Sequence, residues 1–224
     1  MNNKMSKSLY LIIFQLLIFA QHAYSEDIKG FYGRVDSGVS LPLKSGKESL
    51  KDNQLFGSLG VGYHFNDIFR SDINIQYRKF NGKERAFNYK DIQIPIDKNK
   101  VQNIAIMLNG YVNLTDSKDN FIPYITAGIG YGSNKLYESR RNVSDGYIAI
   151  KGKTSSNIIW SIGAGGVIKL TERFGIDLYY RYIDLGKLKS TQVADVPSIS
   201  KLSEKDRSFR LRSNEVGVGI VFNF

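Results

Sequence analysis

The sequence predicts an all-β fold, an eight-stranded antiparallel up-and-down transmembrane barrel with short turns at one end and four long loops at the other. Eight segments alternate apolar residues with polar residues or glycine, as strands with two different faces do. Short and long connections also alternate, as in outer-membrane barrels, where the short turns are periplasmic and the long loops extracellular. After residue 25, no run approaches the roughly 18 apolar residues of a spanning helix, so such a chain would cross a membrane with strands.

Residues 1–25 read as a secretory signal peptide. Lys4 and Lys7 precede an apolar stretch at 9–20, which is too short to span a bilayer as a helix. Small residues at 23–25 stand at the expected cleavage spacing. An uncleaved N-terminal anchor is the alternative. We expect residues 26–224 to form the outer-membrane barrel domain.

The eight alternating segments cover residues 28–41, 54–65, 70–80, 101–114, 121–132, 157–168, 174–184 and 209–224. The last segment is the clearest, because every second residue from Val216 to Phe224 is apolar and most residues between them are small or polar. Each apolar stripe has roughly the 9–11 residues that a tilted strand needs to cross a bilayer. The connections at 66–69, 115–120 and 169–173 are short, whereas those at 41–53, 81–100, 134–156 and 187–207 are long and polar.

The polar faces of the strands distinguish a membrane barrel from a soluble one such as a lipocalin. A soluble barrel turns its polar face to water and would carry lysine along its strands. Here lysine crowds the long loops, and the polar faces carry glycine and charges of both signs, which suit a narrow lumen. Because unpaired buried charge is costly, we predict that these charges form a closed ion-pair network, with a channel as the alternative. The predicted network contains Arg34, Asp36, Asp72, Arg78, Asp177, Arg181 and Glu215.

Aromatic residues lie near both ends of the apolar stripes. They match the two interfacial girdles of membrane barrels and favour a membrane barrel over a soluble one. One set is Tyr63, Phe65, Phe121, Phe174, Phe222 and Phe224, and the other is Tyr77, Tyr131, Trp160, Tyr180 and Tyr182.

The net charge of +10 comes largely from the long loops. We expect their basic residues to capture an acidic host ligand; a merely solvated surface or contact with anionic lipid is the alternative. The candidates are Lys135, Arg140, Arg141, Lys151, Lys187, Lys189, Lys201, Lys205 and Arg207. Arg210 and Arg212 share the outward parity of Val216 just beyond its stripe, so we predict that they contact lipid phosphates or snorkel to the membrane interface. Nucleic acid is not an expected partner of a secreted barrel.

Catalysis and metal binding find little support. The sequence has no cysteine, and His22 would leave with the signal peptide. His64 lies beside a short turn, so we interpret it as a lumen or rim residue, not as a catalytic base. The glycine pairs at 128/130 and 163/165 lie within strands, where close packing explains them better than a phosphate loop. We expect no enzyme activity, no cofactor and no metal.

Four stretches carry a family likeness: Gly110–Thr115, Tyr124–Gly132, Tyr182–Lys187 and Gly217–Phe224. They resemble the opacity-protein-like outer-membrane barrels and, more narrowly, the rickettsial surface adhesins of that group. The resemblance implies adhesion to host cells and, for some members, capture of a host serum protein such as vitronectin. The long loops match no family motif, so no binding residue carries over. We therefore expect a monomeric surface antigen or adhesin in the bacterial outer membrane; a small diffusion pore and a purely structural barrel are the alternatives.

Overall fold

The computed structural model describes residues 30–43, 54–81, 85–89, 92–96, 100–115, 119–143, 146–195 and 203–224. The predicted signal peptide and Lys201 lie outside these ranges. The described side chains likewise exclude those of Arg140, Arg141, Lys205 and Arg207.

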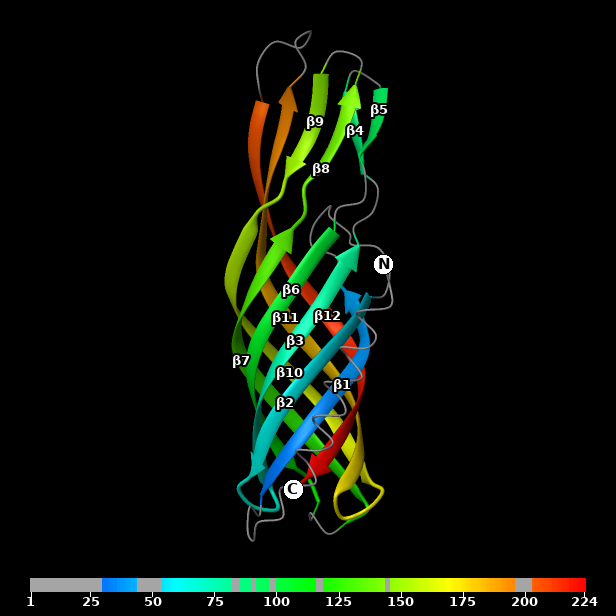
Figure 1. Ribbon diagram of the computed structural model, residues 1–224, viewed down its shortest axis with the longest axis vertical. Coiled ribbons are helices and arrows are strands. Elements are labelled where there is room, and N and C mark those ends of the chain that lie inside the picture. Colours follow the sequence, from blue (N-terminus) through cyan, green and yellow to red (C-terminus); the bar gives the residue numbers. More distant parts are fainter. Residues whose placement is uncertain are drawn as a thin grey trace, which may run out of the picture.

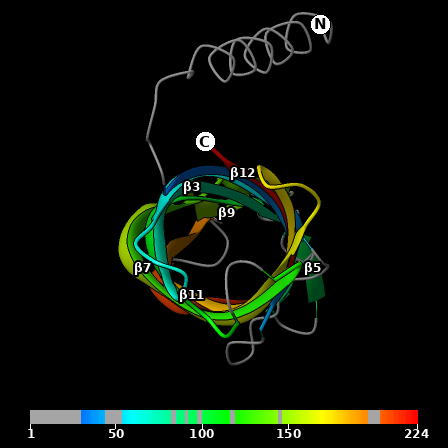
Figure 2. The same cartoon turned by 90° about the horizontal axis from the view of Figure 1, so that it is seen from below.

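Eight long strands close into an antiparallel barrel (Figures 1 and 2). They are β1 (Phe31–Pro42), β2 (Gln54–His64), β3 (Phe69–Asn81), β6 (Lys100–Asn113), β7 (Phe121–Leu136), β10 (Thr154–Lys169), β11 (Phe174–Asp195) and β12 (Ser203–Asn223). Strands that follow one another around the barrel pair in sequence order, and β1 pairs with β12 to close it. Each predicted segment corresponds to one of these strands, so the predicted fold is confirmed. Within the described ranges, no helix is long and apolar enough to span a membrane.

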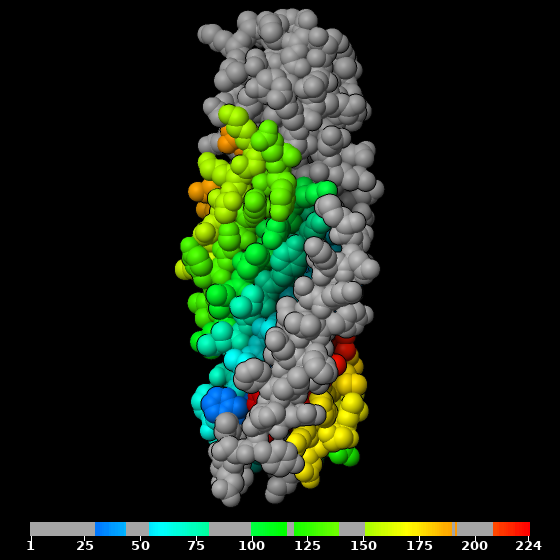
Figure 3. Space-filling view, in the orientation of Figure 1, coloured from blue at the N-terminus to red at the C-terminus, as the bar shows by residue number. Residues whose placement is uncertain are grey.

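The barrel carries apolar side chains on its outer surface and polar side chains in its interior, the reverse of the arrangement in a soluble protein. Val35, Leu59 and Ile75 point outward and are 54–57% exposed, whereas Gln76 and Arg78 point inward and are fully buried. Strand β6 alternates between exposed and buried residues along almost its whole length. Figure 3 shows one face of the resulting cylinder, with β2, β3, β6 and β7 crossing it side by side. Such a surface is stable where the apolar face meets lipid.

Aromatic rings cluster at both ends of this apolar surface, where girdles were predicted. At the short-turn end, Tyr63 lies 4.7 Å from Phe31 and 5.3 Å from Phe65, measured between ring centroids. Phe222 similarly packs against Phe174 and Phe224, at 4.9 and 5.2 Å. Toward the long-loop end, Trp160 and Tyr182 lie 5.3 Å apart.

The long connections are not simple loops, which corrects the sequence interpretation. Residues 81–100 contain the hairpin β4 (Arg85–Tyr89) and β5 (Ile92–Ile96), and residues 134–156 contain β8 (Ser139–Val143) and β9 (Gly146–Lys151). Residues 187–207 mostly continue β11 and β12, which stay paired from Lys187↔Arg210 to Ala194↔Ser203. Strand β9 pairs with the end of β11, and β8 pairs with β9, so the sheet extends beyond the barrel (Figure 1). A polar segment can form such strands because its backbone groups find partners on the neighbouring strand.

The glycine pairs lie inside strands and allow close contact, as predicted. A Cβ atom on Gly130 would collide with the Ile106 carbonyl oxygen, and one on Gly163 would approach the Tyr180 carbonyl oxygen to 2.5 Å. Gly128 and Gly165 are crowded in the same way by inward-pointing side chains. These glycines therefore make room in the lumen and form no phosphate-binding loop.

Candidate functional site

Two clusters of charged side chains lie in the lumen. The one nearer the short turns, here called the lower charge cluster, consists of Arg34, Asp36, Asp72 and Asp177, all of which are buried. The Arg34 Nη2 atom lies 2.7 Å from Asp36 Oδ1 and 3.0 Å from Asp177 Oδ2, and its Nη1 atom lies 3.2 Å from Asp72 Oδ2. Arg34 Nη1 also donates to the Tyr111 hydroxyl at 2.6 Å, and that hydroxyl donates to Asp72 Oδ2 at 2.7 Å. Strands far apart in sequence are thus joined across the barrel interior.

The second cluster lies nearer the long loops and is here called the upper charge cluster. It consists of Arg78, Arg181 and Glu215. Glu215 Oε1 accepts from Arg78 Nε at 2.6 Å, and Glu215 Oε2 lies 2.7 Å from Arg181 Nη2. Gln76 Oε1 accepts from both guanidinium groups. The two clusters together contain all seven predicted lumen residues, and each makes an ion pair inside the barrel.

Aromatic side chains fill the space between the two clusters. The Arg78 and Arg181 guanidinium groups lie 5.6 and 5.3 Å from the Phe56 ring centroid, and Arg181 also lies 5.3 Å from the Tyr179 ring. The cavity between Arg34 and Arg181 measures only about 10 Å³, room for about one water molecule. The middle of the lumen is therefore packed with side chains.

Arg70 is a lumen residue that sequence analysis missed. It begins the alternating face of β3 that continues with Asp72 and Arg78, so parity alone could have identified it. Its guanidinium carbon lies 4.2 and 4.8 Å from the ring centroids of Tyr111 and Tyr124. With Arg70 included, the lumen holds four arginines and four carboxylates among the described residues, so these charges balance.

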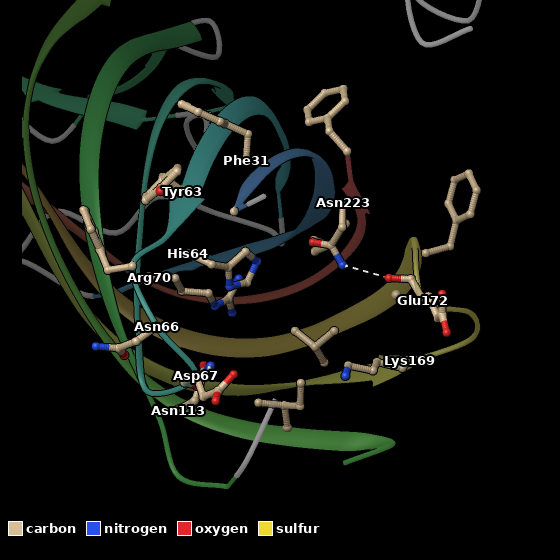
Figure 4. A pocket seen from close by; sticks show the side chains of 18 residues that line it. Phe31, Tyr63, His64, Asn66, Asp67, Arg70, Asn113, Lys169, Glu172 and Asn223 are labelled. Carbon is tan, nitrogen blue, oxygen red and sulfur yellow. Dashed lines mark hydrogen bonds between the residues drawn. The ribbon is translucent and has the colours of Figure 1, made fainter. Parts of the chain in front are cut away.

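A cavity of about 490 Å³, here called the basal cavity, opens at the short-turn end (Figure 4). Arg70, His64, Asn113 and Asn223 line it, with Lys169 and other residues of the turns around its edge. Figure 4 shows His64, Arg70 and Asn223 close together on the inner side of the barrel wall. The His64 ring packs against the Tyr32 ring at a tilt of 51°, with their centroids 4.7 Å apart, and it lies far from the long-loop end, at the lumen edge as interpreted from sequence.

At the long-loop end, a β-bulge reorients β11 where it leaves the barrel. The pairing register shifts between Asp184 and Lys187, and Gly186 adopts a left-handed conformation with φ of 79°. Asn157 fixes the bulge by donating to the Lys187 carbonyl at 2.8 Å and accepting from the Lys187 N–H at 2.9 Å. Because the bulge adds a residue, Lys187 and Lys189 point outward beyond it.

Arg210 and Arg212 point outward, as their parity suggested, and share a carboxylate partner. Their Nε atoms lie 2.8 and 3.3 Å from Asp184 Oδ2, while both side chains stay about half exposed. Asp184, which sequence analysis missed, is buried beneath them. Lys187 faces Arg210 across the β11–β12 pair. Lys187 was predicted to bind an acidic host ligand and Arg210 to contact lipid phosphates, and both lie on the same surface.

Four of the predicted ligand-binding residues have described side chains, and all four are exposed at the long-loop end. Lys135 is near the end of β7 with its Nζ atom 5.1 Å from the Tyr137 ring centroid, and Lys151 ends β9 opposite Thr191 of β11. Lys187 and Lys189 follow on β11 itself. In the described part of the chain, no three His, Asp or Glu side chains are placed to hold a metal ion.

Comparison with known proteins agrees with this architecture. A family model described as an outer membrane protein beta-barrel domain matches residues 11–224. The outer membrane protein PagN of Salmonella typhimurium is 29% identical over 178 residues, covering 75% of this chain and 72% of PagN. A candidate adhesin of Rickettsia typhi is 24% identical over 210 residues, covering 86% of this chain and 87% of the relative.

Solved structures show the same fold at low sequence identity. Neisserial surface protein A is 17% identical with a TM-score of 0.52, covering 88% of this chain and 98% of that structure. OprG of Pseudomonas aeruginosa is 14% identical with a TM-score of 0.54, covering 88% of this chain and all of that structure. The chain belongs to the outer membrane β-barrel family and lies in the bacterial outer membrane. Its short-turn end faces the periplasm, and its long-loop end is exposed at the cell surface.

Proposed function

We propose that this outer-membrane barrel is a monomeric adhesin that presents a basic β-sheet extension to acidic ligands on host cells or in host serum. The observation that carries the proposal is the continuation of β11 and β12 beyond the bulge, together with β8 and β9. Relatives whose names describe them as candidate adhesins support the same role.

The extension is long enough to hold a ligand clear of the membrane. Residues 187–195 of β11 form nine paired or bulge-adjacent positions, and at about 3.3 Å per residue they span roughly 30 Å. Both strands of this stem are hydrogen-bonded to each other, and β11 is also paired with β9. A stem already ordered before binding loses little conformational entropy when a ligand docks.

The charge of the extension favours an acidic partner. Lys135, Lys151, Lys187 and Lys189 are exposed residues of β7, β9 and β11, and lysine ammonium groups donate to sulfate, phosphate or carboxylate oxygens. A sulfated polysaccharide or an acidic host protein such as vitronectin has this chemistry. Nucleic acid is not a proposed partner, because the extension faces the outside of the cell.

Arg210 and Arg212 lie lower on the same surface, and we propose that they contact lipid phosphates. Each keeps its guanidinium half exposed although its Nε atom pairs with Asp184. Asp184 faces Trp160 of β10 in register, and Trp160 belongs to the aromatic girdle that marks the membrane interface. One carboxylate shared by two arginines leaves a local excess of positive charge for phosphate oxygens.

The described residues support a pore or an enzyme less well than they support an adhesin. The two charge clusters and the rings between them occupy the middle of the lumen, where the cavity lined by Arg34, Tyr179 and Arg181 measures about 10 Å³. His64, the sole histidine after the predicted signal peptide, lies at the periplasmic end, away from surface substrates.

A capture experiment tests the proposed function. The refolded barrel is immobilised and exposed to host serum and to solubilised host surface proteins over a series of salt concentrations. A matched variant has residues 134–152 and 187–207 shortened to turns. We expect capture that weakens as salt screens charges beyond about 8 Å at 0.15 M ionic strength and that is absent in the variant. Equal capture by both proteins would contradict the proposal.

A further inference from the structure

We propose that the basal cavity binds a small hydroxylated or amino-bearing organic anion from the periplasm, with its carboxylate or phosphate on the Arg70 guanidinium. This inference is independent of adhesion, because the cavity lies among the short turns and the basic extension lies at the other end of the barrel (Figure 1).

Arg70 is a buried cation with unused donors. Its side chain lines the cavity and the residue is only 3% exposed, yet neither Nη1 nor Nη2 makes a well-formed hydrogen bond within the described ranges, although the Tyr32 side chain lies close by. Tyr32, Tyr111 and Tyr124 surround its guanidinium at 4.2–5.6 Å from their ring centroids. Ring contacts stabilise the charge but do not replace hydrogen bonds from N–H groups, which lie in the guanidinium plane.

Arg34, in the same lumen, has carboxylate partners for its terminal nitrogens and can be compared with Arg70. Its terminal nitrogens bind Asp36, Asp72 and Asp177. Tyr111 and Tyr124, whose rings contact Arg70, donate their hydroxyls to Asp72 and Asp177. The nearby carboxylates are therefore already engaged with other groups. An anion from outside the chain can accept two parallel hydrogen bonds from the Arg70 guanidinium.

The cavity also presents unused acceptors. Asn113 donates its amide to the Asp67 carbonyl at 2.8 Å, and Asn223 donates to the Glu172 carbonyl at 3.3 Å. These bonds fix the two amides. The Asn113 Oδ1 atom is left buried without a partner among the described residues, whereas the Asn223 side chain lies beside His64 but makes no well-formed hydrogen bond through its Oδ1 atom. A ligand with a hydroxyl or ammonium group beside its anionic group would satisfy both the donors and the acceptors.

The shape of the cavity suits retention and not passage. Ile122, Val167 and Val221 contribute apolar wall, and the volume of about 490 Å³ is ample for a small organic anion. Above it, the lumen narrows to the cavity of about 10 Å³ between the charge clusters. The basal cavity is therefore a closed-ended pocket open to the periplasm.

Titrations of the refolded barrel with matched anions test this inference. Glycolate is compared with acetate, and glycerol 3-phosphate with propyl phosphate, because the members of each pair differ only by hydroxyl groups. Binding is followed by calorimetry and by the NMR signals of the arginine side chains. We expect saturable binding of the hydroxylated anions with a dissociation constant on the order of 1 mM, and weaker binding of their partners. Comparing the dissociation constants of glycolate and glycerol 3-phosphate also shows whether the cavity prefers a carboxylate or a phosphate.

Three variants make the outcome decisive. Arg70→Gln should weaken binding about tenfold or more, because it removes the charge-assisted bonds, whereas Arg173→Gln in the adjacent turn should not. Asn113→Ala combined with Asn223→Ala keeps Arg70 and should abolish the preference for hydroxylated anions. If Arg70→Gln does not fold, this asparagine variant decides. The absence of saturable binding by the wild-type barrel, or a preference unchanged in the asparagine variant, would overturn the inference and leave the cavity filled by water.

Discussion

Replacing Glu215 with glutamine should strongly destabilise the barrel. Glu215 is fully buried and is the shared carboxylate partner of Arg78 and Arg181 in the upper charge cluster. The substitution keeps the size of the side chain but leaves two buried guanidinium groups without their counterion. Breaking a buried ion pair from one side costs about 3–5 kcal/mol, and we expect a loss of that size.

Urea unfolding of barrels inserted in lipid vesicles measures this effect. The chain has a single tryptophan, Trp160, whose outward position at the membrane interface makes its fluorescence a direct reporter of insertion. Glu172→Gln, in an exposed periplasmic turn, is the matched control and should change stability by no more than about 0.5 kcal/mol. In a double-mutant cycle, adding Arg181→Met should cost less in the Glu215→Gln background than alone. A Glu215→Gln barrel as stable as the control would refute the assignment of the upper cluster as a coupled buried network.

Three further predictions concern other parts of the barrel. Planar bilayers containing the refolded protein should show no large, steady single-channel current, because side chains fill the lumen; a stable open channel would show that the clusters do not seal it. Gly186→Ala should destabilise the extension by about 1–2 kcal/mol, since its φ of 79° disfavours a side chain and a Cβ would collide with Asn157; faster proteolysis of residues 187–207, with barrel unfolding unchanged, is the expected readout. Replacing Arg210 and Arg212 with alanine should remove the extra stability that anionic phospholipid confers, about 1 kcal/mol per arginine, and an unchanged difference between neutral and anionic vesicles would argue against phosphate contact.

The membrane-spanning part was predictable because lipid and lumen impose opposite demands on alternate residues. The pattern Val216, Val218, Ile220 assigns the outward face of β12 without any tertiary information. The same parity placed Arg34 and Glu215 inside, where narrow space and low polarity require charged groups to pair. Arg70 was overlooked because it lies at the boundary between a turn and a strand, where the period is hardest to assign.

The extracellular strands were not predictable in the same way. Beyond the bulge the chain is mostly polar, so residues 187–195 and 203–208 carry no sustained two-residue hydrophobic period and read as loop, although Leu188 is buried. Their pairing depends on the register that β11 and β12 already have inside the barrel. The bulge at Gly186, and with it the burial of Asp184 beneath two arginines, follows from that register and from contact with Asn157.

Adhesion of bacteria that display the protein tests the central claim most directly. Non-adherent cells expressing the wild-type barrel are compared with cells expressing a variant in which Lys135, Lys151, Lys187 and Lys189 are replaced by glutamate. Arg173→Glu, a charge reversal at the periplasmic end, serves as control, and surface expression is matched. Our account predicts that host-cell binding is lost in the lysine variant and retained in the control. Binding that survives reversal of these four charges would contradict a basic extracellular extension as the adhesive surface.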